Sequence, residues 1–533
     1  MMRRAFAALV GLLMVLVLAA CSDGVSLPGF GGSGGVERDP ALAGGTLRIA
    51  AATELEDLAP VMERAADDLG FGIEMEFPGG TLENSERLAA GEFDGAYDGT
   101  WFATNRYVEL IGASGKLTGA DKIASSPVAL GVRADTAREL GWTDAAPTWS
   151  DIAAAAGDGD LTFAMTDPGT SNSGFSALVS VATALADTGN ALTVADIDRV
   201  APQLSELFGG QTVTSGSSGW LADTFRDDPS RADALVNYES VLHALATDGL
   251  DIEVIVPADG VVSADYPLSA LAEPADPLAR DRVAALAEWL YANPDVMAES
   301  FRRPAESTDL DPALTTDLLI ELPFPGSREV TDRLVDAYQN TLRAPGDTAF
   351  VLDTSESMTG ERMTSLQETM VSLVDGTARS STGPVGLRDR ERVSLMPFSS
   401  APAAPTTVRF STTDPGPGGE LRAAIEGLQP AGATALYSAL IDAYGAIEVG
   451  DGAIPSIVLM SDGENTAGAD LQQFLGFHRG LPEDRRSIPV FVILYGEANV
   501  AEMEEVAEVT GGKVFDALDG DLGAAFREIR GYQ

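Results

Sequence analysis

The chain has 533 residues and a formal net charge of −47, because 81 Asp and Glu residues outnumber 34 Lys and Arg residues. Polyanion binding needs a basic surface, so we expect no nucleic-acid partner. A single cysteine excludes a disulfide framework. The length predicts two or three domains rather than one.

The first 21 residues have the pattern of an export signal. Arg3 and Arg4 form a basic start, an apolar run covers 5–18, and Leu18-Ala-Ala-Cys21 closes it. This run is short for a membrane span, and no basic stop follows it. It resembles the lipobox of bacterial lipoproteins. The resemblance implies a signal peptide over 1–20, attachment of acyl groups such as palmitate to Cys21, and anchoring to the extracytoplasmic face of the cell membrane.

Strands and helices alternate after a Gly- and Ser-containing stretch, 21–44, that predicts a flexible tether. Apolar alternation predicts strands at 45–53, 73–77 and 93–97. Amphipathic helices are expected between them, at 54–69 and 82–91. A second unit of the same kind begins at 127–132 and reaches a strand at 161–165. This order predicts an α/β domain with parallel strands covered by helices.

A Gly- and hydroxyl-rich loop from Thr166 to Ser176 opens the next predicted helix. Free backbone N–H groups at a helix start, joined by small hydroxyls, can hold an anion or a polar ligand. The same residues are equally compatible with a simple helix cap.

Residues 45–305 resemble the type 2 periplasmic solute-binding proteins, especially the branch that handles molybdate and similar oxyanions. Besides the loop above, the resemblance rests on Phe77-Pro-Gly-Gly-Thr81, Ser126-Pro-Val-Ala-Leu-Gly-Val-Arg133, Val236-Asn-Tyr-Glu-Ser240, Tyr266-Pro-Leu268 and the helix at 284–292. It implies two α/β lobes that close on a ligand. It also implies a pocket formed by Thr53, Thr81, Thr100, Thr170, Ser171, Ser173 and Tyr238.

The residues of this pocket do not identify the class of its ligand. Glu54 and Asp98 flank it, and a carboxylate near an anion raises the electrostatic cost of binding. An anionic solute, a small polar organic solute and no solute at all therefore remain as alternatives. Tyr238 and Glu239 are also compatible with core packing beside a solvated acid.

Residues 306–345 are acidic and contain several prolines, which predicts a linker. Within it, 330–342 has the periodicity of an amphipathic helix that would pack on one of the two flanking domains.

The most specific pattern of the chain lies at 349–358, where an apolar strand ends in Asp353-Thr-Ser355-Glu-Ser357. Two further polar residues also lie where an element of the predicted sheet domain begins or ends. Thr434 precedes a helical run, and Asp462 follows an apolar strand. Open α/β sheets bind ligands at the edge where their parallel strands end. Carboxylates and hydroxyls gathered there would suit Mg²⁺, although the same residues could simply cap strands and helices.

Asp-x-Ser-x-Ser with a later Thr and Asp resembles the metal-ion-dependent adhesion site (MIDAS) of von Willebrand factor type A domains. The resemblance implies a doubly wound, Rossmann-like α/β domain over 346–531. It further implies that Asp353, Ser355, Ser357, Thr434 and Asp462 hold Mg²⁺, with Mn²⁺ or Ca²⁺ as substitutes. An acidic residue of a protein partner would complete the metal coordination.

No catalytic arrangement is recognisable in the sequence. His243 and His478 are the two histidines, and no phosphate-binding loop occurs, so we expect a protein that is not an enzyme. The leading hypothesis is a membrane-anchored extracytoplasmic protein that binds a protein partner through the metal site and is regulated by a small solute. The alternative is the solute receptor of an ABC-type transporter with an accessory type A domain.

Overall fold

The computed structural model describes residues 38–307, 310–314, 318–380, 383–449, 452–462, 464–494, 500–516 and 529. The predicted signal peptide and Cys21 lie outside these residues, as does most of the predicted tether. Among the described helices, none is both long enough and apolar enough to cross a membrane.

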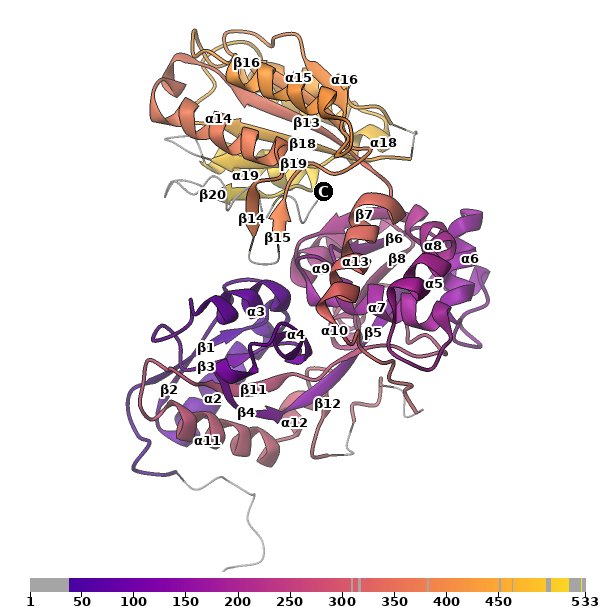
Figure 1. Ribbon diagram of the computed structural model, residues 1–533, viewed down its shortest axis with the longest axis vertical. Coiled ribbons are helices and arrows are strands. Elements are labelled where there is room, and N and C mark those ends of the chain that lie inside the picture. The colour runs from indigo at the N-terminus through magenta and orange to yellow at the C-terminus, as the bar shows by residue number, and fades with distance from the viewer. Residues whose placement is uncertain are drawn as a thin grey trace, which may run out of the picture. The chain divides into compact units, whose positions relative to one another are not determined.

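The N-terminal domain has two lobes, each built around its own sheet (Figure 1). In the first lobe the strand order is β2-β1-β3-β11-β4. β1 pairs in parallel with β2 and β3, whereas β11 is antiparallel to β3 and β4. The strands are β1 (Thr46–Ala51), β2 (Gly72–Glu76), β3 (Gly99–Trp101), β4 (Leu117–Lys122) and β11 (Pro267–Leu271). The helices are η1 (Thr53–Leu58), α2 (Ala59–Leu69), α3 (Thr81–Ala90), α4 (Arg106–Leu110), η2 (Ser114–Lys116), α11 (Ala279–Ala292) and α12 (Asp295–Ala298).

The strand predicted at 93–97 is wrong. These residues form turns, and the strand follows at β3. The backbone N–H of Tyr97 donates to the carbonyl of Phe93, so the two rings lie on one side of a turn, 5.1 Å apart. Two apolar residues four positions apart fit a helical turn as well as an alternating strand, and burial of both rings decides between them.

The second lobe has the strand order β10-β5-β8-β6-β7, with β9 and β12 also paired to β5. Its strands are β5 (Ala124–Arg133), β6 (Phe163–Thr166), β7 (Gln211–Ser215), β8 (Ala234–Tyr238), β9 (Ile252–Ile255), β10 (Ser263–Ala264) and β12 (Arg303–Pro304). Its helices are α5 (Ala134–Glu139), α6 (Trp149–Asp158), α7 (Asn172–Ala186), α8 (Val194–Gly209), α9 (Ser218–Asp227), η3 (Pro229–Arg231) and α10 (Glu239–Thr247). The chain enters this lobe between β4 and β5, leaves it between β10 and β11, and returns to it between α12 and β12, so three crossings connect these elements of the two lobes.

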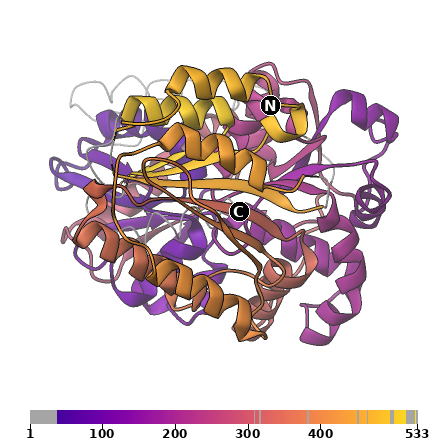
Figure 2. The ribbon, with the colours of Figure 1, turned by 90° about the horizontal axis from the view of Figure 1, so that it is seen from above.

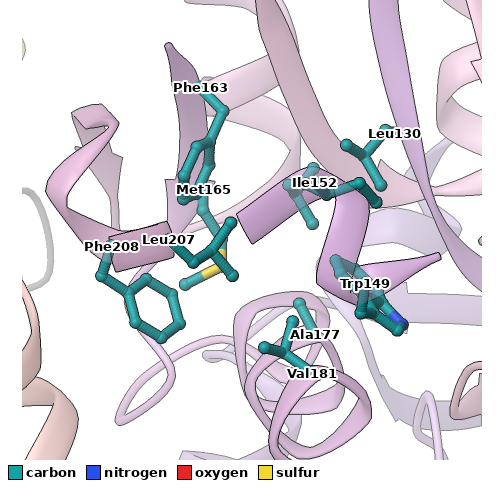
Figure 3. A pocket seen from close by; sticks show the side chains of 10 residues that line it. Leu130, Trp149, Ile152, Phe163, Met165, Ala177, Val181, Leu207 and Phe208 are labelled. Carbon is teal, nitrogen blue, oxygen red and sulfur yellow. The ribbon is translucent and has the colours of Figure 1, made fainter. Parts of the chain in front are cut away.

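The core of the second lobe contains one small void of about 10 Å³ (Figure 3). It is lined by apolar side chains that include Trp149, Phe163 and Met165. A void of this size has room for roughly one water molecule, and an apolar lining keeps it dry. It is a packing gap, too small for an organic solute.

The predicted linker contains a helix, α13 (Arg328–Ala337), extended by one turn of π-helix, η4 (Tyr338–Leu342). Its apolar face packs on the N-terminal domain. The ring of Tyr338 lies 5.0 Å from that of Phe208, and its hydroxyl donates a 2.9 Å hydrogen bond to Gln211.

The C-terminal domain is a doubly wound sheet with the strand order β17-β16-β13-β18-β19-β20. All neighbouring strands are parallel except the edge strand β17. The strands are β13 (Gly346–Asp353), β16 (Arg392–Phe398), β17 (Thr406–Arg409), β18 (Ile454–Ser461), β19 (Val490–Leu494) and β20 (Val514–Asp516). β14 (Ala378–Ser380) and β15 (Gly383–Val385) form a separate hairpin.

Helices cover both faces of this sheet, as Figure 2 shows in orange and yellow. One core packs Leu366 and Ile425, from α14 and α15, against the first face. The other packs Leu440, Phe474 and Val506, from α16, α17 and α19, against the second. The helices are η5 (Glu356–Met358), α14 (Glu361–Val374), α15 (Pro415–Glu426), α16 (Leu436–Ala446), α17 (Leu471–Arg479), α18 (Glu483–Arg486) and α19 (Val500–Thr510). The predicted three-layer α/β architecture is confirmed.

Candidate functional site

Asp353 ends the central strand β13 and is fully buried. Its Oδ1 accepts a hydrogen bond of 2.8 Å from the backbone N–H of Ser355, and its Oδ2 accepts one of 2.6 Å from the hydroxyl of Ser461. Burial raises the pKa of Asp353, and the nearby charge of Asp462 raises it further. A cation beside the two carboxyl groups would favour their charged forms.

A chain of hydrogen bonds connects the end of β13 with the end of β18. The hydroxyls of Ser355 and Ser357 lie 2.9 Å apart, and Ser357 donates a 2.9 Å hydrogen bond to Oδ1 of Asp462. Asp462 directly follows β18, which is the parallel neighbour of β13. The structure therefore brings four of the five predicted metal ligands into one bonded cluster.

Thr434, the fifth predicted ligand, lies on the loop before α16, and this loop reaches the same edge of the sheet. The backbone N–H of Glu356 donates to the carbonyl of Gly432 at 3.1 Å, and that of Ala431 donates to the carbonyl of Thr354 at 2.8 Å. Thr434 itself is buried. The two loops are thus joined on the side where the ligand cluster lies.

Sequence reasoning missed Arg362, in the first turn of α14. One guanidinium nitrogen of Arg362 lies 2.5 Å from Oδ2 of Asp462, so this carboxylate has one oxygen in the hydroxyl cluster and one in an ion pair. The Arg362 side chain is 43% exposed, whereas that of Asp462 is buried. The available signal was a basic residue five positions beyond Ser357, at the start of the following helix.

The oxygen-rich cluster fits a hard divalent cation. The four bonded residues offer two carboxylates and two hydroxyls, and Thr434 on the adjoining loop would add a third hydroxyl. This is the ligand type that Mg²⁺ takes together with water. In the described ranges no group of three or more His, Cys, Asp or Glu residues is arranged to hold a metal ion. Any metal binding at this edge would therefore depend on the hydroxyls as well as on the carboxylates.

In the N-terminal domain, the hydroxyl-rich loop leads into α7. Ser173 bonds to the hydroxyls of Thr166 at 2.9 Å, Ser218 at 2.7 Å and Ser171 at 3.2 Å. Ser171 and Ser173 are both buried. These two predicted pocket residues thus belong to one closed cluster of hydroxyls.

Thr170, on the same loop, touches the first lobe. A Cβ atom added to Gly80 would come within 2.2 Å of the Thr170 carbonyl oxygen, so only glycine fits there. Thr81 follows Gly80 and accepts a 3.2 Å hydrogen bond from the backbone N–H of Ala103. The start of α3, which carries Thr81, and the loop that carries Thr170 therefore meet between the lobes.

Tyr238 lies at the end of β8, beside Glu54 of the first lobe. Its hydroxyl accepts a 2.7 Å hydrogen bond from Asn172, and its ring lies edge-to-face on Tyr266 with centroids 6.3 Å apart. Oε1 of Glu54 is buried without a hydrogen-bond partner, and burial raises the pKa of Glu54 to about 7. Thr53 lies beside this carboxyl and lowers its pKa. Thr53 and Tyr238 are thus brought together around Glu54.

Thr100, the last predicted pocket residue, lies in β3 beside Ala50 and Ser269 of the adjacent strands. It is fully buried, and its Oγ1 has no hydrogen-bond partner. No side-chain hydrogen bond joins it to the other predicted pocket residues in the described part of the chain.

Two expectations about the acidic residues near the pocket are corrected. Asp98 accepts backbone hydrogen bonds from Arg48 at 2.9 Å and Asp276 at 2.7 Å, so it stabilises the first lobe. Glu239 is not a solvated acid. It is buried and forms a bidentate ion pair with Arg303, at 2.8 and 2.9 Å.

Family comparisons agree with this architecture. The family model of the bacterial extracellular solute-binding protein matches residues 47–293, and that of the von Willebrand factor type A domain matches residues 347–528. The chain carries a solute-binding domain followed by a type A domain. Both belong to binding and adhesion families rather than to enzyme families.

Several solved structures resemble parts of the chain. The periplasmic binding protein AfuA from Actinobacillus pleuropneumoniae, with fructose-6-phosphate bound, is 13% identical over 55% of this chain and 97% of its own, with a TM-score of 0.43. The sulfate-binding protein SubI from Mycobacterium tuberculosis is 18% identical over 54% and 98%, with a TM-score of 0.41. A von Willebrand factor type A protein from Catenulispora acidiphila is 17% identical over 36% and 42%, with a TM-score of 0.29. No curated protein sequence matches the chain.

Proposed function

We propose that this protein is a membrane-anchored, extracytoplasmic binding protein whose type A domain engages a protein partner through a divalent cation. The observation that carries the proposal is the bonded cluster of Asp353, Ser355, Ser357 and Asp462 at the carboxyl edge of the sheet. Hard oxygen ligands supplied by two neighbouring parallel strands are what Mg²⁺ binding at this edge requires.

Asp353, Ser355, Ser357, Thr434 and Asp462 would hold Mg²⁺, or Mn²⁺ or Ca²⁺ in its place. When bound, the cation would offer a coordination position to a carboxylate oxygen of the partner. The hydrogen bonds from Ser461 and from the Ser355 backbone orient Asp353 for this role. The exposed side chain of Arg362 can release Asp462 without disturbing the core.

Export and anchoring belong to the same proposal. They are supported by the signal pattern over 1–20, by the lipobox ending in Cys21, and by the extracellular class of the family that matches residues 47–293. Both matched families are binding or adhesion families, which supports a binding protein that catalyses no reaction.

A titration with Mn²⁺, followed by water-proton relaxation on the chain from Ser22 onward, tests the metal site. We expect one tightly bound Mn²⁺ per chain, lost in Asp353→Asn and kept in Glu356→Gln, which changes an exposed neighbouring carboxylate. A short Glu-containing peptide should then displace bound water and lower the relaxation enhancement, whereas its Gln analogue should not. Equal Mn²⁺ binding by wild type and Asp353→Asn would contradict the proposal.

A second function is favoured by the unpartnered Oε1 of Glu54 between the lobes. It is the solute receptor of a transporter, with the type A domain as an accessory. Solute affinity distinguishes the two functions. If the solute regulates adhesion, the affinities for solute and divalent cation must change each other by the same factor. For a plain receptor, the solute affinity would be the same with and without the cation.

A further inference from the structure

Buried oxygen atoms that no protein group satisfies lie where the two lobes meet. Oε1 of Glu54, Oδ1 of Asn172 and the hydroxyl of Tyr266 make no hydrogen bond within the described chain. Asn172 and Tyr266 are almost fully buried, at 3% and 1% exposure. These groups belong together, because Asn172 bonds to Tyr238, and both tyrosines interact electrostatically with Glu54. A buried polar atom without a partner is costly, so a ligand that supplies the missing bond would be stabilised here.

For Glu54 and Asn172 the missing partners are hydrogen-bond donors. A carboxylate oxygen and an amide oxygen can only accept, and Asn172 already uses its Nδ2 to donate to Tyr238. The neighbouring hydroxyls of Thr166, Ser171, Ser173 and Ser218 are joined to one another by hydrogen bonds. An oxyanion next to Glu54 and Asn172 would therefore meet two acceptor oxygens, which cannot donate to it.

The charges at this place also favour a cation. Arg302 is buried and bonds to both carboxylate oxygens of Asp57, at 2.8 and 3.0 Å, and to the backbone carbonyl of Glu54. Because Arg302 and Asp57 neutralise each other, the carboxylate of Glu54 gives this place a net negative charge. The rings of Tyr238 and Tyr266 stand edge-to-face near it, and the Arg302 guanidinium lies 5.5 Å from the centroid of the Tyr266 ring.

We propose that the solute of the N-terminal domain is a small organic cation that carries N–H groups, such as a protonated primary amine or a guanidinium, with Glu54 as its counter-ion and Tyr238 beside it. This inference rests on the proposed solute-binding role and specifies its ligand class. It departs from the oxyanion binding that the sequence resemblance implies for this domain.

Calorimetric titration of the chain from Ser22 onward tests the inference. One panel of probes contains ethanolammonium, putrescine and guanidinium, and the other contains sulfate, phosphate and molybdate. We expect at least one amine to bind with one site per chain, and Glu54→Gln to weaken it by 10-fold or more. Glu56→Gln is the matched control, because Glu56 lies exposed on the same helical turn.

The outcomes separate the ligand class from the function. Binding of an oxyanion would overturn the ligand class and keep the solute-binding role. Binding of neither panel would overturn the inference and remove the support for a solute-binding cleft. Equal weakening by Glu54→Gln and Glu56→Gln would mean that the acidic surface alone attracts the amines.

A second inference rests on a different set of contacts, made by the segment 320–338. Toward the first lobe, Glu321 pairs with Arg106 and Arg328 pairs with Glu86, at 2.9 and 2.8 Å. Toward the second lobe, Arg333 pairs with Asp198 at 2.8 Å, and the rest of α13 packs there through its apolar face.

Phe324 lies where the two lobes meet. Its ring packs edge-to-face on Phe175 of the second lobe at 5.5 Å, and the Arg106 guanidinium of the first lobe lies 5.9 Å from its centroid. The segment also pairs with the crossing between the lobes, because the backbone N–H of Leu322 donates to the carbonyl of Val261 at 2.8 Å. We infer that residues 320–338 form a strap that holds the lobes closed and links their opening to the start of the type A domain.

Distances between spin labels test the strap. Glu63→Cys and Asp144→Cys place one label on an exposed site of each lobe, in the chain from Ser22 onward, which has no other cysteine. Arg328→Glu or Phe324→Ala should shift the distances to longer values. Arg333→Glu is the matched control and should leave them unchanged, because α13 remains packed on the second lobe. Unchanged distances in both test variants would overturn the inference.

Discussion

Replacing Glu54 with Gln should stabilise the protein at neutral pH and not at acidic pH. In the unfolded chain this carboxyl titrates near 4.5, whereas burial raises its pKa to about 7 in the folded domain. Below pH 4.5 both states are protonated, and the stability linked to this group is fully present. It is lost as pH rises through 7, because the folded state must then hold a buried charge. The difference between the two pKa values corresponds to about 3 kcal/mol.

Thermal melting of wild type and Glu54→Gln at pH 5 and pH 8 measures this effect. Glutamine mimics the neutral acid, so at pH 5, only half a unit above the unfolded pKa of 4.5, the two proteins should differ in stability by less than about 1 kcal/mol. At pH 8 the variant should melt higher by roughly 5–10 °C in the transition of the N-terminal domain. Glu56→Gln, an exposed change in the same helix, should track the wild type at both values. A melting difference that is equal at pH 5 and pH 8 would refute the placement of Glu54 in a buried site.

Three further predictions concern other contacts. Arg303→Ala leaves Glu239 buried without its ion-pair partner and should cost about 3–5 kcal/mol, measured by denaturant unfolding; a loss below 1 kcal/mol would contradict the burial of this pair. Arg362→Ala removes the cation that competes for Asp462 and should tighten Mn²⁺ binding several-fold in a calorimetric titration, whereas weaker binding would show that Arg362 assists the site. Gly80→Ala puts a Cβ within 2.2 Å of a backbone oxygen of the second lobe, so it should widen the interlobe distance between spin labels, and an unchanged distance would refute direct contact of the lobes.

The sheet edge of the type A domain was predictable because its signals are local. An apolar run that ends in Asp353-Thr-Ser355 identifies a strand and the residues at its carboxyl end. A second apolar run ending before Asp462 does the same, and neighbouring parallel strands place their ends together. Pattern and topology therefore sufficed to associate residues more than 100 positions apart.

Other parts of the sites depend on side-chain directions that no periodicity encodes. The ion pair of Arg362 with Asp462 follows from how the first turn of α14 points toward the sheet edge. The sequence allowed a solvated Glu239, because nothing near it in the chain shows that Arg303, on the distant strand β12, lies beside it. The role of Glu54 likewise depends on the closure of two lobes, a long-range arrangement that the residues around it do not reveal.

The most direct test of the account is thermal melting of the chain from Ser22 onward in 10 mM Mg²⁺ and in EDTA, for wild type and Asp353→Ala. A cation present at 100 times its dissociation constant stabilises a protein by about 2.7 kcal/mol. The account predicts that Mg²⁺ raises the melting temperature of the type A domain in the wild type and leaves the variant unchanged. Identical melting of the wild type in Mg²⁺ and EDTA would contradict a metal-binding type A domain.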